Sequence, residues 1–259
     1  MVWFTSVIGL VDRLVDLARR EDPTLAAALD GVAEAEVAEV EVRCGVRLPA
    51  TYREFLRTMG RSSGRFVWER GYDHGFATIT RRLPTDAYPA RYFKIAQTTD
   101  DHVADDGTAV DYFLDLEHGD GVDAPLVTFE DPTLRDPDAD PDYPGLRPAG
   151  RFASRFTRSW FRCVVLERQR CGETVEIASS SDRVVAVLKE LGFVEVLPPL
   201  PDTRCLRRGA EDGALVMDRV GVVMEIMSRE RDVFDRVFDR LPVARTLAHG
   251  VRRPRNSRS

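Results

Sequence analysis

Apolar residues recur at helical spacing in two consecutive segments, residues 32–44 and 49–60. In the first segment they stand at i, i+4, i+7 and i+11 with glutamates on the other faces, which predicts an amphipathic helix. Gly45 follows the last apolar position, where the left-handed conformation that ends many helices favours a residue without a Cβ. Pro49 then begins a second helix, because its missing N–H costs nothing there. The pattern predicts two helices joined by a hinge.

The second helix has apolar residues at i, i+3, i+4 and i+7, and Gly60 ends it. Burying the apolar side chains of both helices would contribute roughly 1.5–3 kcal/mol each before entropy, so the hairpin is a plausible folding nucleus. Hinge geometry or burial explains each residue of the hinge and of the second helix, and we interpret them as structural. These residues are Gly45, Leu48, Pro49, Tyr52, Phe55 and Leu56.

The same residues carry a family resemblance. An acidic helix ending in Cys44-Gly45, then Leu48-Pro49-x-x-Tyr52-x-x-Phe55-Leu56 and Gly60, resembles the opening motif of the SUKH superfamily, the Smi/Knr-like domains. Residues 111–116, a glycine-containing turn and residues 124–127 resemble the central hairpin of that family, and residues 152–166 resemble its closing helix. The resemblance covers about residues 30–168.

The resemblance implies an α+β fold, with a mixed sheet and flanking helices. SUKH proteins are mostly known as bacterial immunity proteins that bind and neutralise a toxin, and as eukaryotic interaction modules. No shared catalytic residue comes with the family, so the resemblance favours a binding protein over an enzyme.

Two further segments extend the fold prediction. Residues 2–20 repeat apolar positions at helical spacing, and the helix packs on the hairpin or binds a partner. Between residues 65 and 130, runs rich in β-branched and aromatic residues predict the strands of one sheet. In the run 111–116 the two faces differ, so we expect helices to cover one face and water to reach the other. The predicted strands span 66–69, 76–80, 92–96, 111–116 and 125–129.

A second series of predicted strands and helices begins after residue 170. It comprises a strand near 174–178, a serine-capped helix over 182–191, four more strands and a helix over 230–241, which together predict a smaller α+β module of no recognised family. The chain after residue 244 holds five arginines and no acid and is expected to be a disordered tail. The four later strands are near 193–197, 204–207, 214–218 and 222–226. The predicted domains are residues 1–172, 173–244 and 245–259.

Composition and targeting signals restrict the class of protein. A hydrophobic content of 43% is ordinary for a soluble globular chain of 259 residues. Residues 2–11 are apolar but follow no basic region and precede no cleavage site, so we expect neither a signal peptide nor a membrane span, and a cytoplasmic protein. The cysteines show no C-x-x-C spacing and are expected to be reduced, without a disulfide framework or zinc. They are Cys44, Cys163, Cys171 and Cys205.

Three patterns mimic catalytic or metal sites. Gly60 to Gly64 satisfies the G-x-S-x-G pattern around Ser62, but a nucleophile elbow needs a strand before the serine and a helix after it. The alternating aspartates from residue 136 mimic a calcium loop, yet Pro141 stands where glycine is required and Arg147 where glutamate is required. The histidines lack ligand spacing. Three of the four histidines lie in predicted turns, namely His74, His102 and His118. We therefore expect no cofactor, no metal and no enzymatic activity.

The formal net charge of the chain is −6, but acidic and basic residues are concentrated in different segments. Arginines at 151, 155, 158 and 162 form a stripe on the predicted helix 152–166, and they either pair with the chain's own acids, stay hydrated or contact a partner. No aromatic residues interleave with this stripe, which makes nucleic acid an unlikely partner.

Acidic residues are dense between positions 100 and 123, and they are either solvated surface or an interface for a basic partner. The candidate partner-binding residues are Asp100, Asp101, Asp105, Asp106, Asp115, Glu117, Asp120 and Asp123. The resulting hypothesis is a bacterial immunity protein that binds a toxin, with a basic, nuclease-type domain as its partner. The alternative is a regulatory or scaffold interaction module without a toxin partner, and an enzyme is the least favoured class. The oligomeric state is left open.

Overall fold

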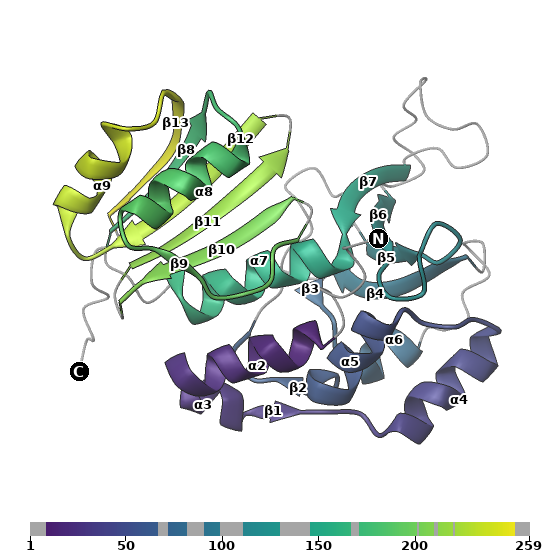
Figure 1. The fold of residues 1–259 in the computed structure, drawn as a ribbon. Coiled ribbons are helices and arrows are strands. Elements are labelled where there is room, and N and C mark those ends of the chain that lie inside the picture. Colours follow the sequence, from purple (N-terminus) through teal and green to yellow (C-terminus); the bar gives the residue numbers. More distant parts are fainter. Residues whose placement is uncertain are drawn as a thin grey trace. The chain divides into compact units, whose positions relative to one another are not determined.

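The chain divides into two compact units, Met1–Ser159 and Trp160–Ser259 (Figure 1). Each unit combines helices with antiparallel strands, which confirms the α+β class. The predicted mixed sheet is wrong, because every strand pair among the described residues is antiparallel. The computed structural model describes residues 9–66, 72–81, 91–98, 111–129, 146–166, 171–200, 202–209, 212–219 and 221–251.

The first unit begins with a series of helices. The predicted N-terminal helix is confirmed from Leu10 onward, and residues 1–8 lie outside the described part of the chain. The helices are α2 (Leu10–Glu21), α3 (Pro23–Ala27), α4 (Glu34–Cys44), α5 (Ala50–Met59) and α6 (Phe76–Arg81), followed by the start of α7 (Phe152–Val164).

The predicted hinge between α4 and α5 is confirmed in detail. Gly45 has φ 65°, in the left-handed region, and its N–H donates to the carbonyl of Val42 over 3.2 Å. The N–H of Val46 donates to the carbonyl of Glu41 over 3.0 Å, so the last turn of α4 is closed by backbone hydrogen bonds. Pro49 stands at the N-cap of α5. The chain therefore reverses where the sequence indicates.

A five-stranded sheet completes the first unit, in the order β3 (Tyr72–Asp73), β4 (Tyr92–Thr98), β5 (Asp111–Asp115), β6 (Pro125–Phe129), β7 (Leu146–Arg151). The predicted strands at 92–96, 111–116 and 125–129 are confirmed. β7 was not predicted, because it contains Pro148 and Gly150, which an edge strand tolerates. A separate two-stranded pair joins β1 (Leu29–Asp30) to β2 (Ser62–Ser63).

The strand predicted at 76–80 is wrong, because these residues form α6. The N–H groups of Thr78 and Ile79 both donate to the carbonyl of Gly75 over 3.0 Å. The Thr80 hydroxyl donates to the carbonyl of Phe76 over 2.8 Å, so the β-branched side chain is satisfied within the helix. Most of the strand predicted at 66–69 lies outside the described residues.

Aromatic side chains form the core of the first unit. The rings of Tyr52 and Phe152 lie 5.2 Å apart, those of Phe55 and Phe156 5.3 Å apart, and Phe66 packs on Phe156 at 5.6 Å. The five side chains come from α5, the segment after β2 and the start of α7, and all are buried. Tyr52 and Phe55 thus lie in the core, where the sequence pattern places them.

Both faces of β5 are buried, which corrects the prediction of a wet face. Tyr112 and Leu114 lie on one face and Phe113 and Asp115 on the other, and all four are buried. Alternation of polar and apolar residues fails here because the polar members are bonded inside the protein.

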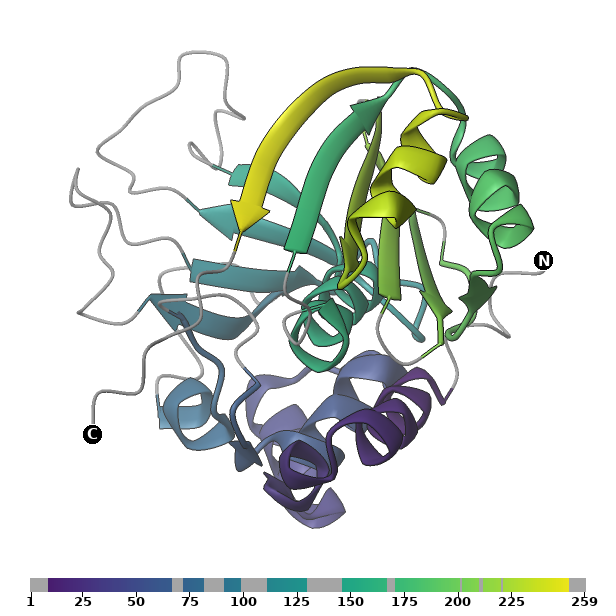
Figure 2. The ribbon, with the colours of Figure 1, turned by 90° about the vertical axis from the view of Figure 1, so that its left-hand side faces the viewer.

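The second unit is a six-stranded antiparallel sheet in the order β13-β8-β12-β11-β10-β9. Helices α8 and α9 lie on the same face (Figure 2), where Leu188 and Val237 pack against Met224 and Val216 of the sheet. The Ser180 side chain accepts a hydrogen bond from the N–H of Arg183, so the predicted serine cap of α8 is confirmed. The elements are β8 (Cys171–Ile177), α8 (Ser181–Glu190), β9 (Val194–Glu195), β10 (Thr203–Arg208), β11 (Asp212–Arg219), β12 (Gly221–Ser228), α9 (Arg231–Phe238) and β13 (Val243–Val251).

The predicted disordered tail is wrong over residues 245–251. This segment belongs to β13, which pairs antiparallel with β8 from Val243 opposite Ile177 to Val251 opposite Cys171. Its alternation of small, polar and apolar residues suits an edge strand, and the basic composition that suggested a tail belongs mostly to residues 252–259. Residues 252–259 lie outside the described part of the chain.

The last turns of α7 cover the opposite face of this sheet. Gly213 of β11 lies under Val165 and Leu166 so closely that a Cβ placed on it would meet both side chains at under 3 Å. Arg162 Nε donates to Glu225 of β12 over 2.7 Å. The compact second unit thus begins inside α7, thirteen residues before the predicted boundary at 172 and 173.

Candidate functional site

The predicted acidic surface falls partly outside the described residues. The residues outside the described part of the chain are Asp100, Asp101, Asp105 and Asp106, together with the alternating aspartates from residue 136. The other four predicted residues stand at the end of β5 and in the turn that leads to β6. They are Asp115, Glu117, Asp120 and Asp123.

Asp115 is a turn-forming residue. Its side chain is buried, and Oδ1 accepts from the N–H groups of Glu117 and His118 over 3.2 and 3.3 Å. Oδ2 lies 2.9 Å from His118 Nδ1. The carboxylate therefore satisfies the backbone where the chain leaves β5.

Asp120 and Asp123 are tied to Arg151 at the end of β7. Arg151 donates from Nε to Asp123 Oδ2 and from a terminal nitrogen to Asp120 Oδ2, each over 2.9 Å. Asp123 Oδ1 accepts from the N–H of Ala153 over 3.0 Å, so this carboxylate also caps the start of α7. Burial raises the pKa of Asp123, and the Arg151 guanidinium opposes that shift.

These contacts correct the predicted partner-binding set. Asp115 and Asp123 are buried and bonded within the unit, so they are structural and not part of a surface. Asp120 and Glu117 are exposed, but each is paired with an arginine, since Arg91 donates to Glu117 over 2.8 Å. The dense acids of the sequence are thus partly neutralised by basic residues that lie far away along the chain.

The arginine stripe of α7 is likewise used inside the protein. A terminal nitrogen of Arg155 donates to the Tyr112 hydroxyl over 2.7 Å, and its guanidinium lies 4.9 Å from that ring. Arg158 is buried, with Nε donating to the carbonyl of Ser154 over 3.3 Å. With Arg151 and Arg162 also paired to carboxylates, the interpretation of internal pairing is the one that the contacts favour.

The serines of the G-x-S-x-G pattern make structural hydrogen bonds. The Ser62 hydroxyl donates to the carbonyl of Ala28 over 3.0 Å. The Ser63 hydroxyl donates to the carbonyl of Phe66 over 2.9 Å and lies 3.1 Å from His74 Nε2. Both serine hydroxyls therefore bond to backbone carbonyls of the same unit. Burial lowers the pKa of His74.

A surface recess that the sequence analysis missed lies beside the α4–α5 hinge. It has a volume of about 460 Å³ and is closed on one side by the turn at Gly121. The N–H of Ala50 donates to the carbonyl of Gly121 over 3.0 Å, and the N–H of Thr51 to that of Val122 over 2.9 Å, which fixes the turn against the start of α5. Its charged lining residues are Glu34, Arg47, Arg53, Glu54 and Arg57.

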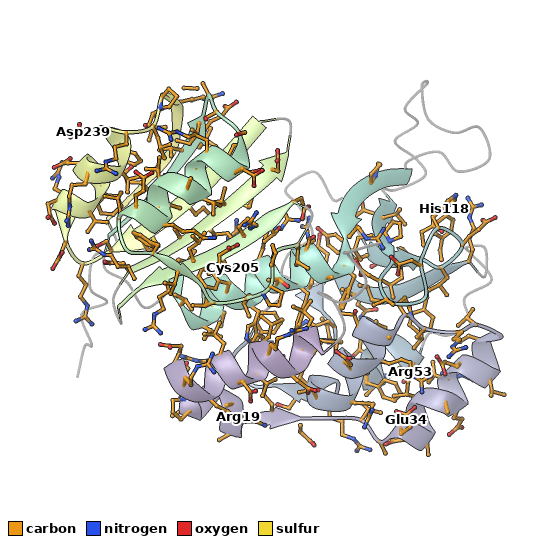
Figure 3. The ribbon with its side chains drawn as sticks, in the orientation of Figure 1. Arg19, Glu34, Arg53, His118, Cys205 and Asp239 are labelled. Carbon is orange, nitrogen blue, oxygen red and sulfur yellow. The ribbon has the colours of Figure 1, made fainter. Side chains whose placement is uncertain are left out.

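Arginines and glutamates alternate around this recess. Arg53 donates to the carboxylates of Glu34 and Glu41. Figure 3 labels Arg53 and Glu34. Arg57 Nε lies 3.2 Å from Glu34 Oε2, in a pair whose side chains are 59% and 50% exposed. Arg47 is exposed and has no ion pair with any residue that the structure describes. Among the described residues, the Arg47 guanidinium of the recess therefore has no carboxylate partner.

Glu54 faces the N-terminal end of α2. Its Oε1 accepts from the N–H of Gly9 over 3.2 Å. Gly9 precedes the first residue of α2, and a negative charge is favoured at this end of a helix. Burial raises the pKa of Glu54. This carboxylate thus anchors α2 to α5.

Neither the family models nor the curated protein sequences contain a match to this chain. The SUKH resemblance therefore stays a prediction, carried by the hairpin residues.

The described residues also bear on metals and membranes. Among them, no group of three or more His, Cys, Asp or Glu side chains lies close enough to hold a metal ion, and His102 is outside this part of the chain. Within the same residues, no helix combines the length and apolar character needed to cross a bilayer. Cys44, Cys163 and Cys205 form no disulfide with another described residue.

The recess could have been suspected from the sequence. Arg53 and Arg57 are four residues apart on α5, so they lie on one face of the helix, and Arg47 stands in the hinge just before it. What the sequence could not provide is the position of the turn at Gly121, which is distant in the chain. The arrangement offers guanidinium donors that suit a carboxylate or a phosphate.

Proposed function

We propose that this protein is a non-catalytic binding protein of the immunity type, which binds and neutralises a toxin polypeptide in the cytoplasm. The observation that carries the proposal is the α4–α5 hairpin. Its left-handed Gly45 and its buried Tyr52 and Phe55 use the residues of the resemblance in the roles that those residue types suit. The recess beside the hinge adds a concave surface on which a partner could bind.

The proposed partner is a basic toxin domain. Fewer acidic residues are available to attract such a partner than the composition suggested. Residues 100–145 contain fifteen acids and one arginine, but Asp115 and Asp123 serve the fold. The remaining acids are sufficient to steer a basic partner, because rim charges act chiefly on the rate of association. The charge argument rests on Glu117, Asp120 and the aspartates at 100–106.

Co-expression tests the proposal directly. The neighbouring genes are searched for a toxin-like domain, the chain is expressed together with that domain, and growth and co-purification are measured. We expect growth to be restored and the two polypeptides to purify as a complex. The control is expression of the toxin-like domain alone. A complex without growth rescue would favour the regulatory or scaffold alternative, and neither rescue nor a complex would contradict the immunity proposal.

A further inference from the structure

The hinge that carries Arg47 is held rigidly. The Leu48 N–H donates to Glu41 Oε1 over 2.7 Å, and the N–H of Val46 donates to the carbonyl of Glu41. Arg47 stands between these two bonded residues, so its backbone is fixed at the mouth of the recess while its side chain is exposed. A cation on a fixed backbone loses less entropy when it binds a ligand than one on a mobile loop.

The other two arginines differ in how firmly they are engaged. Arg53 bridges Glu34 and Glu41, and the Glu41 side chain is only 13% exposed, so this pair belongs to the fold. Arg57 holds Glu34 in an exposed pair, and exposed pairs contribute little to stability. An incoming anion can therefore compete with Glu34 for Arg57, and Arg47 lines the same recess.

The charge around the recess selects the kind of anion. The recess is lined by three arginines and by Glu34 and Glu54, and Arg53 also pairs with Glu41. The site therefore has no large positive excess for a phosphate dianion. A single carboxylate suits it better, since a planar guanidinium binds a carboxylate through two parallel hydrogen bonds. The volume of about 460 Å³ can hold such a side chain with the backbone around it.

We infer that this recess binds a carboxylate, supplied by an aspartate or glutamate side chain of the protein partner, with Arg47 as its main donor and Arg57 as the second. The inference rests on the proposed function for the identity of the partner, although the chemistry of the recess does not depend on it. The proposed carboxylate contact is one part of the interface. Acidic residues at the rim of that interface can still attract a partner that is basic as a whole.

The first experiment probes the chemistry without a partner. The full chain is titrated with a blocked Gly-Asp-Gly peptide, its Gly-Asn-Gly counterpart and inorganic phosphate at equal ionic strength, while the arginine Nε–H signals are followed by NMR. We expect the aspartyl peptide to shift the Arg47 signal saturably and the other two probes to bind more weakly. No saturable shift, an equal response to the asparaginyl peptide, or tighter binding of phosphate would overturn the inference.

The second experiment uses matched variants. Arg47→Gln removes the unpaired charge of the recess, and Arg20→Gln removes an exposed charge of α2 that has no ion pair with a described residue. Loss of a charge-assisted hydrogen bond should weaken both peptide and partner binding about tenfold or more in R47Q and leave them unchanged in R20Q. Equal affinities of R47Q and the parent chain would overturn the inference.

The two proposals fail in different ways. If the toxin-like domain forms a complex that R47Q does not weaken, the recess inference is wrong and the proposed function stands. If the aspartyl peptide binds through Arg47 but the toxin-like domain forms no complex, the recess stands and the proposed function is wrong.

Discussion

Arg151 donates from Nε to Asp123 Oδ2 over 2.9 Å, and the other oxygen of Asp123 accepts from the N–H of Ala153 at the start of α7. One carboxylate thus joins the β5–β6 turn, the edge strand β7 and a helix of the aromatic core. Asp123 is buried and both of its oxygens accept hydrogen bonds, so an asparagine would place an amide donor opposite either the helix N–H or the Arg151 guanidinium, which are donors themselves.

We predict that Asp123→Asn lowers the free energy of unfolding by about 1–3 kcal/mol, measured by urea denaturation. Glu117→Gln is the matched control, because Glu117 is 58% exposed and pairs with Arg91 at the surface. It should change stability little. Replacing several of these acids together, as a test of a charged interface, would therefore confound folding with binding. A D123N variant as stable as the parent would show that Asp123 belongs to the surface.

The pKa shift of Asp123 predicts how this contribution changes with pH. Because burial raises the pKa in the folded protein above the ordinary value of about 3.9, the folded state binds more protons than the unfolded state between those two values. Stability contributed by this group is fully present below about pH 3.9 and is lost as the pH rises through the raised pKa. The free energy of unfolding of the parent chain minus that of D123N should fall over this window. A difference that rises instead would mean that Arg151 outweighs burial.

Tyr52 gives a prediction about the core. It is fully buried, its ring contacts Phe55, Phe93 and Phe152, and its hydroxyl has no hydrogen-bond partner among the described residues. Tyr52→Ala should cost roughly 3–5 kcal/mol, because it empties the centre of the aromatic cluster.

Tyr52→Phe separates ring packing from the hydroxyl. This variant removes a buried polar group without changing the packing, so its thermal midpoint should equal or exceed that of the parent. A loss of stability in Tyr52→Phe would reveal a partner for the hydroxyl.

The elements that could be predicted from the sequence are those specified by interactions between residues that are close together in the chain. The α4–α5 hairpin was predicted because Gly45, Pro49 and the apolar spacing act within a few residues of each other. Three strands of the first sheet and most of the second unit were predicted for the same reason. The helix at 76–81 was missed because β-branched composition outweighed the helix-starting bonds to Gly75 in our interpretation.

The candidate site was harder to predict, because pairing across the fold decides which charges are free. The sequence places the acids from 111 to 123 in one block, but Arg91, just before β4, and Arg151 of β7 neutralise several of them. The recess is likewise formed by Arg47 and Gly121, which are distant in the chain. Local patterns contain no information on such pairs.

The position of β13 predicts where the chain can be shortened. Removal of residues 252–259 leaves β13 complete, whereas removal of residues 243–259 leaves β8 paired with β12 alone and makes it the edge strand. Each backbone hydrogen bond contributes about 0.5–1.5 kcal/mol net, so the loss of a whole strand should cost several kcal/mol. We expect the chain 1–251 to unfold at the temperature of the parent and the chain 1–242 to unfold earlier, measured by circular dichroism. Equal midpoints would mean that β13 adds nothing to the sheet.

The end of α7 leads to a prediction about the second unit. Phe161, Val165 and Leu166 are buried, and Val165 and Leu166 lie directly over Gly213 of β11. Arg162 adds an ion pair to Glu225 of β12. A fragment that begins at residue 173 lacks all four residues and exposes the face of β11 that they cover.

We therefore expect the fragment 152–259, which keeps the whole of α7, to be folded and the fragment 173–259 to bind a dye for exposed apolar surface and to unfold less cooperatively. By the same argument the fragment 1–172 should expose the apolar end of α7 and be less soluble than the full chain. Arg162→Gln in the full chain is the control, since it breaks the ion pair but keeps the apolar cover, and it should destabilise far less than the truncation. If 173–259 is as stable as 152–259, the covering turns of α7 are dispensable and the boundary after residue 172 is the correct one.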